Sequence, residues 1–224
     1  NHSKDKFSCS LGLKANRVHF SNISINKSYY NFLPKAMLGY RLNENSFIRY
    51  DVEMSQTNPT LVELTDTEIR LDPYLAERGN LLLKPYSNLN NNLFYEHKKG
   101  LFTFNANLRH HYKHNPIMES VKEQGNIFLI IPENMKSWNK YNAEMNLKVG
   151  KDILQFSLTG GYNHFNSQGN NYSHEYSNFY YSANVLAMYK KWMFIVQIQP
   201  FDEKLYGETV IKSGNYHYLA IQYN

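Results

Sequence analysis

Histidine is the side chain here best suited to catalysis or metal binding, and three histidines lie close together. His110, His111 and His114 fall in a stretch where apolar and polar residues alternate. Neighbouring residues of a β-strand point to opposite faces, so His110 and His111 cannot share one metal ion. His164 and His174 give no stronger pattern. We therefore predict no metal site and no cofactor.

Motifs for other chemistry are missing from the sequence. It contains no glycine-rich phosphate loop, no G-x-S-x-G turn and no H-E-x-x-H motif. A single cysteine, Cys9, excludes a disulfide within the chain and a cysteine-rich metal site. The formal charge of +5 comes from basic residues spread without a compact patch, which argues against nucleic acid as a partner. The sequence predicts no catalytic residues and no enzyme.

Polar and charged side chains recur at every second position of the alternating segments. In lipid such groups would be very costly, so their face must meet water or a polar filling. We assign Arg49, Asp51, Glu53, Arg109 and Glu144 to this inward face. Its other members are Arg41, Asn105, Asn107, Asn142, Asn146, Lys148, Gln155, Gln197 and Gln199.

The alternation itself predicts β-strands, because a helix would repeat every 3.6 residues. No apolar run approaches the roughly 20 residues of a transmembrane helix, so any membrane span must be a strand. We expect about ten strands, many long enough to reach the roughly 9–11 residues that a tilted strand needs to cross a bilayer. They cover residues 7–14, 36–42, 48–55, 89–96, 102–118, 127–149, 154–162, 179–189, 192–198 and 219–223.

The connections alternate between short turns and mostly longer loops. Short turns are predicted at 43–45, 98–100, 123–125, 150–152 and 190–191, and loops at 15–29, 56–86, 166–175 and 201–214. Outer-membrane barrels show this asymmetry, with aromatic side chains near strand ends. Such residues here are Tyr95, Phe102, Tyr112, Tyr141, Tyr162, Tyr189 and Trp192. The predicted fold is all-β, an antiparallel up-and-down transmembrane β-barrel segment covering residues 1–224 as one domain. A soluble β-protein is the alternative.

Two sequence motifs carry a resemblance to a known family. Gly79–Tyr86 reads GNLLLKPY and precedes a strand, and Asn58–Leu64 reads NPTLVEL. They resemble the "GNP-x-LKPE" and "RP-s-xxEL" elements of TonB-dependent receptors and of related Bacteroidetes-type outer-membrane barrel proteins. The sequence departs from the pattern at Asn58, Leu81 and Tyr86, where the family usually has Arg, Pro and Glu.

The resemblance implies the C-terminal barrel portion of a nutrient receptor in the outer membrane of a Gram-negative bacterium. Such receptors have about 22 strands, so this chain would be part of a larger barrel, with no plug domain of its own. The opening residues 1–6 lack the apolar core of a signal peptide, as expected for an internal piece. The inward face would then hold the plug. The ligand would contact the long loop through Glu68, Arg70, Asp72, Tyr74 and Arg78.

The implied partners follow from the same resemblance. They are outer-membrane lipid, the plug domain of the same parent chain, the energy-coupling TonB protein through an N-terminal region, and a surface lipoprotein. A complete small barrel acting as a porin, an adhesin or a surface hydrolase is the alternative. A porin would need a closed barrel without a plug, and a hydrolase would need acidic residues and a histidine converging at the rim.

Overall fold

The computed structural model describes residues 6–21, 26–151, 153–200 and 202–223, and its regular structure there is entirely β. No helix in these ranges is long and apolar enough to cross a membrane. Ten strands form one antiparallel sheet in the order β1, β2, β3, β6, β7, β10, β11, β12, β13, β16. They are β1 (Phe7–Ser21), β2 (Asn26–Asn43), β3 (Ser46–Thr57), β6 (Tyr86–Lys99), β7 (Phe102–His114), β10 (Ser137–Lys151), β11 (Leu154–Gln168), β12 (Ser173–Tyr189), β13 (Trp192–Gln199) and β16 (Tyr216–Tyr223).

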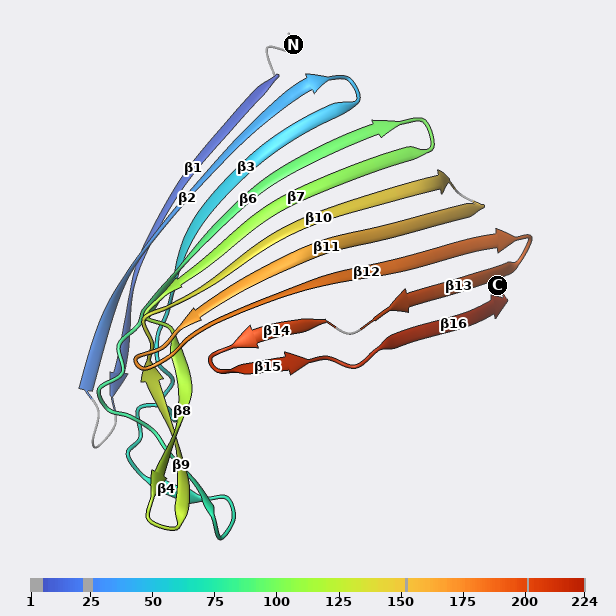
Figure 1. The fold of residues 1–224 in the computed structure, drawn as a ribbon. Coiled ribbons are helices and arrows are strands. Elements are labelled where there is room, and N and C mark those ends of the chain that lie inside the picture. The colour runs from blue at the N-terminus through green and yellow to red at the C-terminus, as the bar shows by residue number, and fades with distance from the viewer. Residues whose placement is uncertain (1–5, 22–25, 152, 201, 224) are drawn as a thin grey trace.

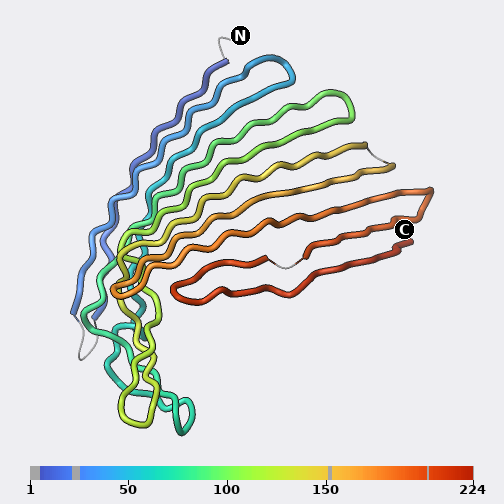
Figure 2. Tube along the Cα trace, viewed as in Figure 1, coloured from blue at the N-terminus to red at the C-terminus, as the bar shows by residue number. Residues whose placement is uncertain are grey.

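This sheet confirms the predicted ten-stranded antiparallel architecture. Its strands lie side by side in chain order and curve into an open arch (Figure 1). The short turns gather at one end and the longer connections at the other, as the Cα trace also shows (Figure 2). Gly100 and Lys190 take left-handed backbone angles at two of the short turns, with φ of 59° and 54°. The sheet is therefore an up-and-down curved wall with two structurally different ends.

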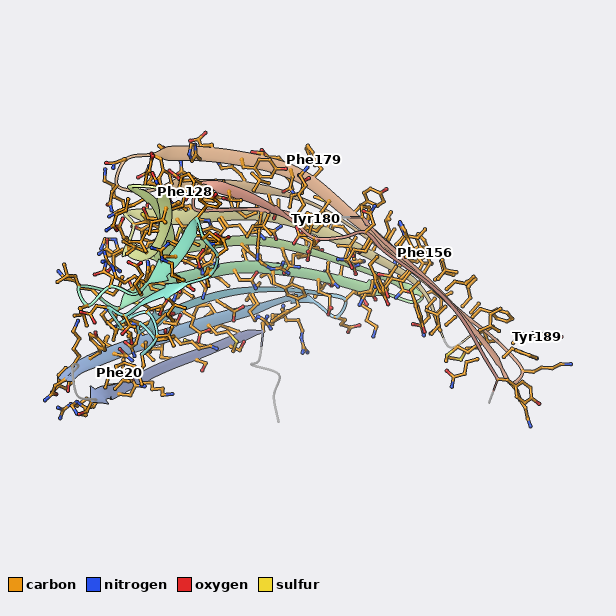
Figure 3. All side chains as sticks on the ribbon, turned by 90° about the horizontal axis from the view of Figure 1, so that it is seen from below. Phe20, Phe128, Phe156, Phe179, Tyr180 and Tyr189 are labelled. Atoms are coloured by element: carbon orange, nitrogen blue, oxygen red, sulfur yellow. The ribbon has the colours of Figure 1, made fainter. Side chains whose placement is uncertain are left out.

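The strand register shows which residues lie on each face of this wall. One row of directly paired residues runs Tyr50, Leu93, Leu108, Ala143, Tyr162 and Phe179. The adjacent row runs Arg49, Phe94, Asn107, Glu144, Gly161 and Tyr180. Figure 3 shows Phe179 on the convex side of the arch and Tyr180 on the concave side. The convex face is thus largely apolar and the concave face largely polar, as the alternation predicted.

The prediction of a polar loop over residues 15–29 was wrong. β1 continues to Ser21 and β2 already begins at Asn26, with residues 22–25 outside the described ranges. Ala15 pairs with Phe32 and Arg17 with Tyr30. Asn and Ser have low strand propensity, but pairing with a neighbouring strand overrides a weak local preference. The predicted loop over 166–175 shortens for the same reason, to the four residues between β11 and β12.

The prediction that one strand runs from Phe102 towards Met118 was also wrong, as was its unbroken return from Ile127 to Val149. β7 ends at His114 because Asn115 adopts a φ of 55° and Pro116 cannot donate to a ladder. β8 (Ile117–Gln124) and β9 (Ile127–Asn134) form a hairpin in a separate sheet. Its turn contains Gly125, with a φ of 64°, which confirms that turn.

Two of the predicted loops contain strands of their own. β4 (Glu68–Arg70) and β5 (Leu75–Arg78) lie in the 56–86 loop and join β9 and β8 in a four-stranded sheet, β5 pairing with β9 in parallel. β14 (Glu203–Tyr206) and β15 (Thr209–Lys212) form a hairpin within the 201–214 loop, and Phe201 lies outside the described residues. The long connections are therefore folded structures: the four-stranded sheet lies beyond the end of the ten-stranded sheet, and the β14–β15 hairpin lies beside β12 (Figure 1).

The buried apolar side chains gather in these connections and beside them. One cluster contains Met118, Met135, Trp138, Phe165 and Leu205. A second contains Leu64, Leu83 and Ile117, and a third Ala76, Leu129 and Ile131. Most of the ten-stranded sheet contributes nothing to them, because its apolar side chains face outwards. Burial against other protein therefore stabilises the loop end, whereas the wall itself relies on its strand ladders and on whatever covers its convex face.

Candidate functional site

The first family-like motif forms a capped turn. Glu63 Oε2 accepts hydrogen bonds from the Thr60 backbone N–H at 2.7 Å and from its hydroxyl at 2.9 Å. The Thr60 hydroxyl in turn accepts the Glu63 N–H at 3.2 Å, a reciprocal arrangement that satisfies both residues. This turn directs Leu64, which has no exposed surface, into its cluster with Leu83 and Ile117. The Thr and Glu of this motif are therefore structural.

The second motif packs directly on the first. A Cβ atom at Gly79 would lie 2.2 Å from the carbonyl oxygen of Thr65 and 2.6 Å from that of Glu63, so only glycine fits there. Asn80 follows, and its backbone N–H donates to the Glu63 carbonyl at 2.6 Å. The Asn80 side chain also donates to the carbonyl of Pro132 at 3.1 Å, which ties the motif to β9. The two motifs thus form the centre of the folded loops.

These loops enclose a cavity of about 260 Å³, called the loop cavity below. It is bounded by three separate connections: the 58–85 segment, the β8–β9 hairpin and the β14–β15 hairpin. Apolar side chains, including Ile117, Met118 and Ile130, line much of it. Its polar side chains are those of Glu63, Thr65, Thr67, Glu77, Arg78, Glu119 and Tyr206. An apolar surface with a few polar groups is the usual form of a small-molecule site.

The predicted ligand-binding residues divide into two groups. Arg78 lines the loop cavity. Glu68, Arg70, Asp72 and Tyr74 lie instead around the exposed β4–β5 turn, where Glu68 and Arg70 form an ion pair at 3.7 Å. Asp72 accepts the backbone N–H of Tyr74 at 2.7 Å, so its carboxylate holds the turn. The structure brings these four residues to the tip of the loop and not into the cavity.

Sequence reasoning missed Glu119 and Tyr206 as cavity residues. Both lie in segments more than 30 residues from the motifs, and only the folding of three connections brings them together. Burial raises the pKa of Tyr206, and the nearby Glu119 carboxylate raises it further. Its hydroxyl therefore stays protonated at neutral pH and is available to donate a hydrogen bond into the cavity.

The predicted inward residues Arg49, Asp51 and Glu53 all form ion pairs on the concave face. Arg49 Nε donates to Asp51 Oδ2 at 2.8 Å, and its guanidinium lies 5.4 Å from the Phe94 ring. Glu53 pairs with Lys35 on the neighbouring strand at 3.6 Å. Exposed ion pairs of this kind contribute little to stability, typically about 0–1 kcal/mol.

Arg109 and Glu144 belong to a tighter network on β7, β10 and β12. Arg109 donates to Glu144 Oε1 at 3.0 Å and to Asn142 Oδ1 at 3.2 Å. The Tyr180 hydroxyl donates to Glu144 Oε2 at 2.7 Å. Tyr180 reaches this position because Gly161 has no side chain; a Cβ there would lie 2.4 Å from the Tyr180 ring. Charge-assisted bonds of this type fix side chains firmly.

The histidines behave as strand geometry predicts. His110 stacks on Tyr141 with ring centroids 4.5 Å apart, and its register neighbours Asn91 and Tyr141 belong to the convex face. His111 points to the other face, where it meets the edge of Trp138 at 5.4 Å. Among the described residues, no group of three His, Cys, Asp or Glu side chains could hold a metal ion.

Solved structures share the fold over nearly the whole chain. The copper transporter OprC matches with a TM-score of 0.69 at 10% identity, over 97% of this chain and 38% of that one. A mutant of the ferric enterobactin receptor PfeA from Pseudomonas aeruginosa matches with a TM-score of 0.63 at 13% identity, over 96% and 34%. The siderophore receptor PirA from Acinetobacter baumannii matches with 0.63 at 11% identity, over 97% and 37%.

These matches show a shared fold. They confirm the predicted likeness to TonB-dependent receptor barrels, and the chain spans less than half the length of each of those structures. No curated protein sequence matches the chain. A family model, however, matches residues 1–207, nearly the entire sequence. The chain belongs to the outer membrane protein beta-barrel family, and the outer membrane is its location, as the sequence predicted.

Proposed function

We propose that this chain is part of the barrel wall of a TonB-dependent-like receptor that imports a nutrient across the outer membrane. The observation that carries the proposal is the fit of almost the whole chain to 34–45% of larger receptor and transporter structures. In the sheet order, β1 and β16 stand at opposite ends, and they do not pair with each other within the described residues. Further strands of the parent protein would pair with these two edges, because an unpaired edge is very costly in lipid.

The polarity of the concave face favours a plugged barrel rather than an open pore. Some of its charged residues already form ion pairs with their neighbours, as between Arg109 and Glu144 and between Arg49 and Asp51, so part of its polarity is satisfied within the wall. Such a surface suits contact with a polar protein domain that must remain able to move. We assign this contact to Arg49, Asp51, Glu53, Arg109 and Glu144, with the plug coming from the same parent chain and coupled to TonB through its N-terminal region.

The folded loops support ligand capture on the outer side. Long connections that are themselves folded often carry binding functions on a rigid scaffold. The loop cavity, with Arg78 at its wall, would make the main contact, and Glu68, Arg70, Asp72 and Tyr74 at the exposed tip would meet the ligand or a surface lipoprotein first. Lipid would cover the convex face. The fold is shared with solved receptors, and an outer-membrane barrel of this kind suits a protein that is not an enzyme.

Ion conductance separates this proposal from a porin. The complete gene product is inserted into a planar lipid bilayer, and conductance is compared with a variant that lacks everything upstream of the barrel strands. A plugged receptor is expected to give no steady conductance until that upstream region is removed, because the plug fills the lumen. Steady conductance from the complete protein would contradict the proposal and would favour the porin reading.

A further inference from the structure

The loop cavity lies on one face of the four-stranded sheet that contains β4, β5, β9 and β8. Ile69, Glu77 and Ile130 are paired directly across three of these strands, and all three line the cavity. Glu119 pairs with Pro132 on the same face. The opposite face of the sheet carries the third buried cluster. The floor of the loop cavity is therefore a regular sheet that is packed from behind.

The other two buried clusters hold the remaining walls. Ile117 belongs to the second cluster and Met118 to the first, which also contains Leu205. Tyr206 follows Leu205 along β14 and lines the cavity from that side. A cavity whose walls are held by packed clusters exists before a ligand arrives, and this lowers the entropy cost of binding.

The charged side chains that line the loop cavity are mostly acidic. Glu63, Glu77 and Glu119 supply three negative charges and Arg78 one positive charge, which leaves a net charge of −2. Within the described ranges, Glu77, Arg78 and Glu119 form no ion pair with one another or with other residues. The chain as a whole has a formal charge of +5, so the negative charge of the cavity is a local feature.

The Tyr206 hydroxyl lies in the same negative potential. Burial raises its pKa most, and the carboxylates of Glu119 and Glu63 are among the groups that raise it further. A nearby negative charge disfavours the phenolate for the same reason that it favours a bound cation. The cavity therefore prefers a ligand with a positive charge.

The apolar lining decides what kind of cation fits. The carboxylates share the cavity with the side chains of Val62, Ile69, Ile117, Met118, Ile130 and Pro132. A bare metal ion would leave this apolar surface uncovered, and among the described residues no three His, Cys, Asp or Glu side chains could hold one. At about 30 Å³ for each water molecule, the 260 Å³ of the cavity equals the volume of roughly nine waters. A small organic cation is of this size.

We propose that the loop cavity binds a small apolar amine. An ammonium group has three donors and no acceptor, so it matches the Glu77 and Glu119 carboxylates. Ile117, Met118 and Ile130 would cover the hydrocarbon part. This inference rests on the proposed receptor function and deepens it by naming the class of ligand that the folded loops capture.

Four probe molecules test the charge and the apolar part separately. Isothermal titration calorimetry at low salt, on the complete gene product in detergent micelles, uses phenethylamine, a cation, phenethyl alcohol, its neutral counterpart, phenylacetate, an anion, and ethylamine, a cation without the ring. Phenethylamine is expected to bind with a dissociation constant of roughly 0.1–1 mM, and each of the others at least about tenfold more weakly. Phenethyl alcohol, phenylacetate or ethylamine binding as tightly as phenethylamine would overturn the inference. So would no binding of phenethylamine up to roughly 10 mM.

A matched pair of variants localises the binding. Glu119→Gln keeps the shape of the side chain and removes one charge, and is expected to weaken phenethylamine binding about three- to tenfold. Glu123→Gln is the control, because Glu123 lies on the same face of β8 but outside the loop cavity, and it should leave binding unchanged. Equal losses in the two variants would show a general attraction of cations to the loops and would overturn the inference.

Arg78 tests the sign of the charge preference. Arg78→Met keeps an unbranched apolar side chain and removes the positive charge that opposes a bound cation. Phenethylamine binding is expected to strengthen about two- to fivefold. Weaker binding in this variant, with tighter binding of phenylacetate to the unaltered protein, would mean that the cavity selects an anion through Arg78 and would overturn the inference.

The two proposals fail separately. Phenethylamine binding that depends on Glu119 in a protein with steady open-pore conductance would keep the amine site and refute the receptor. A plugged barrel without phenethylamine binding would keep the receptor and refute the amine site. The conductance experiment and the calorimetry together therefore assign each outcome to one proposal.

Discussion

Replacing Val196 with arginine is expected to destabilise the barrel by about 2–4 kcal/mol, the cost of a charge at the middle of the lipid-facing band. Val196 pairs with Val185 and Leu219 in an apolar row of the convex face. Val196 lies four residues after Trp192, an aromatic residue at the start of β13. At about 3.3 Å per residue along a tilted strand, this separation places Val196 roughly 10 Å further into the lipid-facing band than Trp192. Equilibrium denaturation of the complete gene product in lipid vesicles measures the change.

The adjacent residue supplies the control. Gln197 points to the concave face with Asn184 and Tyr218 as its register neighbours. Gln197→Arg should therefore change the free energy of unfolding by less than about 1 kcal/mol, since that face is polar. If both variants lowered the free energy of unfolding equally, the convex face would not contact lipid. The alternative of a soluble β-protein would then be favoured.

Gly79→Ala is expected to disrupt the folded loops while leaving the ten-stranded sheet in place. The added Cβ would lie within 2.7 Å of three carbonyl oxygens, those of Val62, Glu63 and Thr65, and backbone cannot move aside as a flexible side chain can. The local cost should be at least about 1–3 kcal/mol, the usual range for overpacking. Limited proteolysis should then cleave between Asn58 and Pro85 much faster than in the unaltered protein.

Gly214→Ala is the control for this variant, because no atom lies within 4 Å of a Cβ at that position. It should leave the cleavage pattern as it is in the unaltered protein. Unchanged cleavage in Gly79→Ala would show that the two motifs do not hold the loops together, and the structural account of the motifs would then be wrong.

Much of the wall could be predicted from the sequence, because a strand with one lipid face and one polar face repeats every two residues. Ile48 to Ser55 shows this period clearly, and β3 was placed correctly, whereas β2 was predicted from residue 36 and begins at Asn26. The turn at Lys190 and the aromatic residue Trp192 that follows it were enough to predict a strand end from residue types alone. The period also separated Arg109 and Glu144 from their lipid-facing neighbours.

The loop end could not be predicted in the same way. Asn115 and Pro116 end β7, yet the residues on either side keep alternating, so periodicity alone continues the strand. β14 and β15 have four residues each and are held over the concave face by Trp138 and Asn178, which come from distant strands. The loop cavity depends on three such connections meeting, and only Arg78 of its polar residues was foreseen.

The structure of the complete gene product, solved by electron cryomicroscopy in a lipid nanodisc, tests the central claim most directly. The account predicts that β1 and β16 each pair with a strand from outside residues 1–224, in a barrel of about 22 strands with a folded plug inside. Direct pairing of β1 with β16 in a closed ten-stranded barrel with an empty lumen would contradict it.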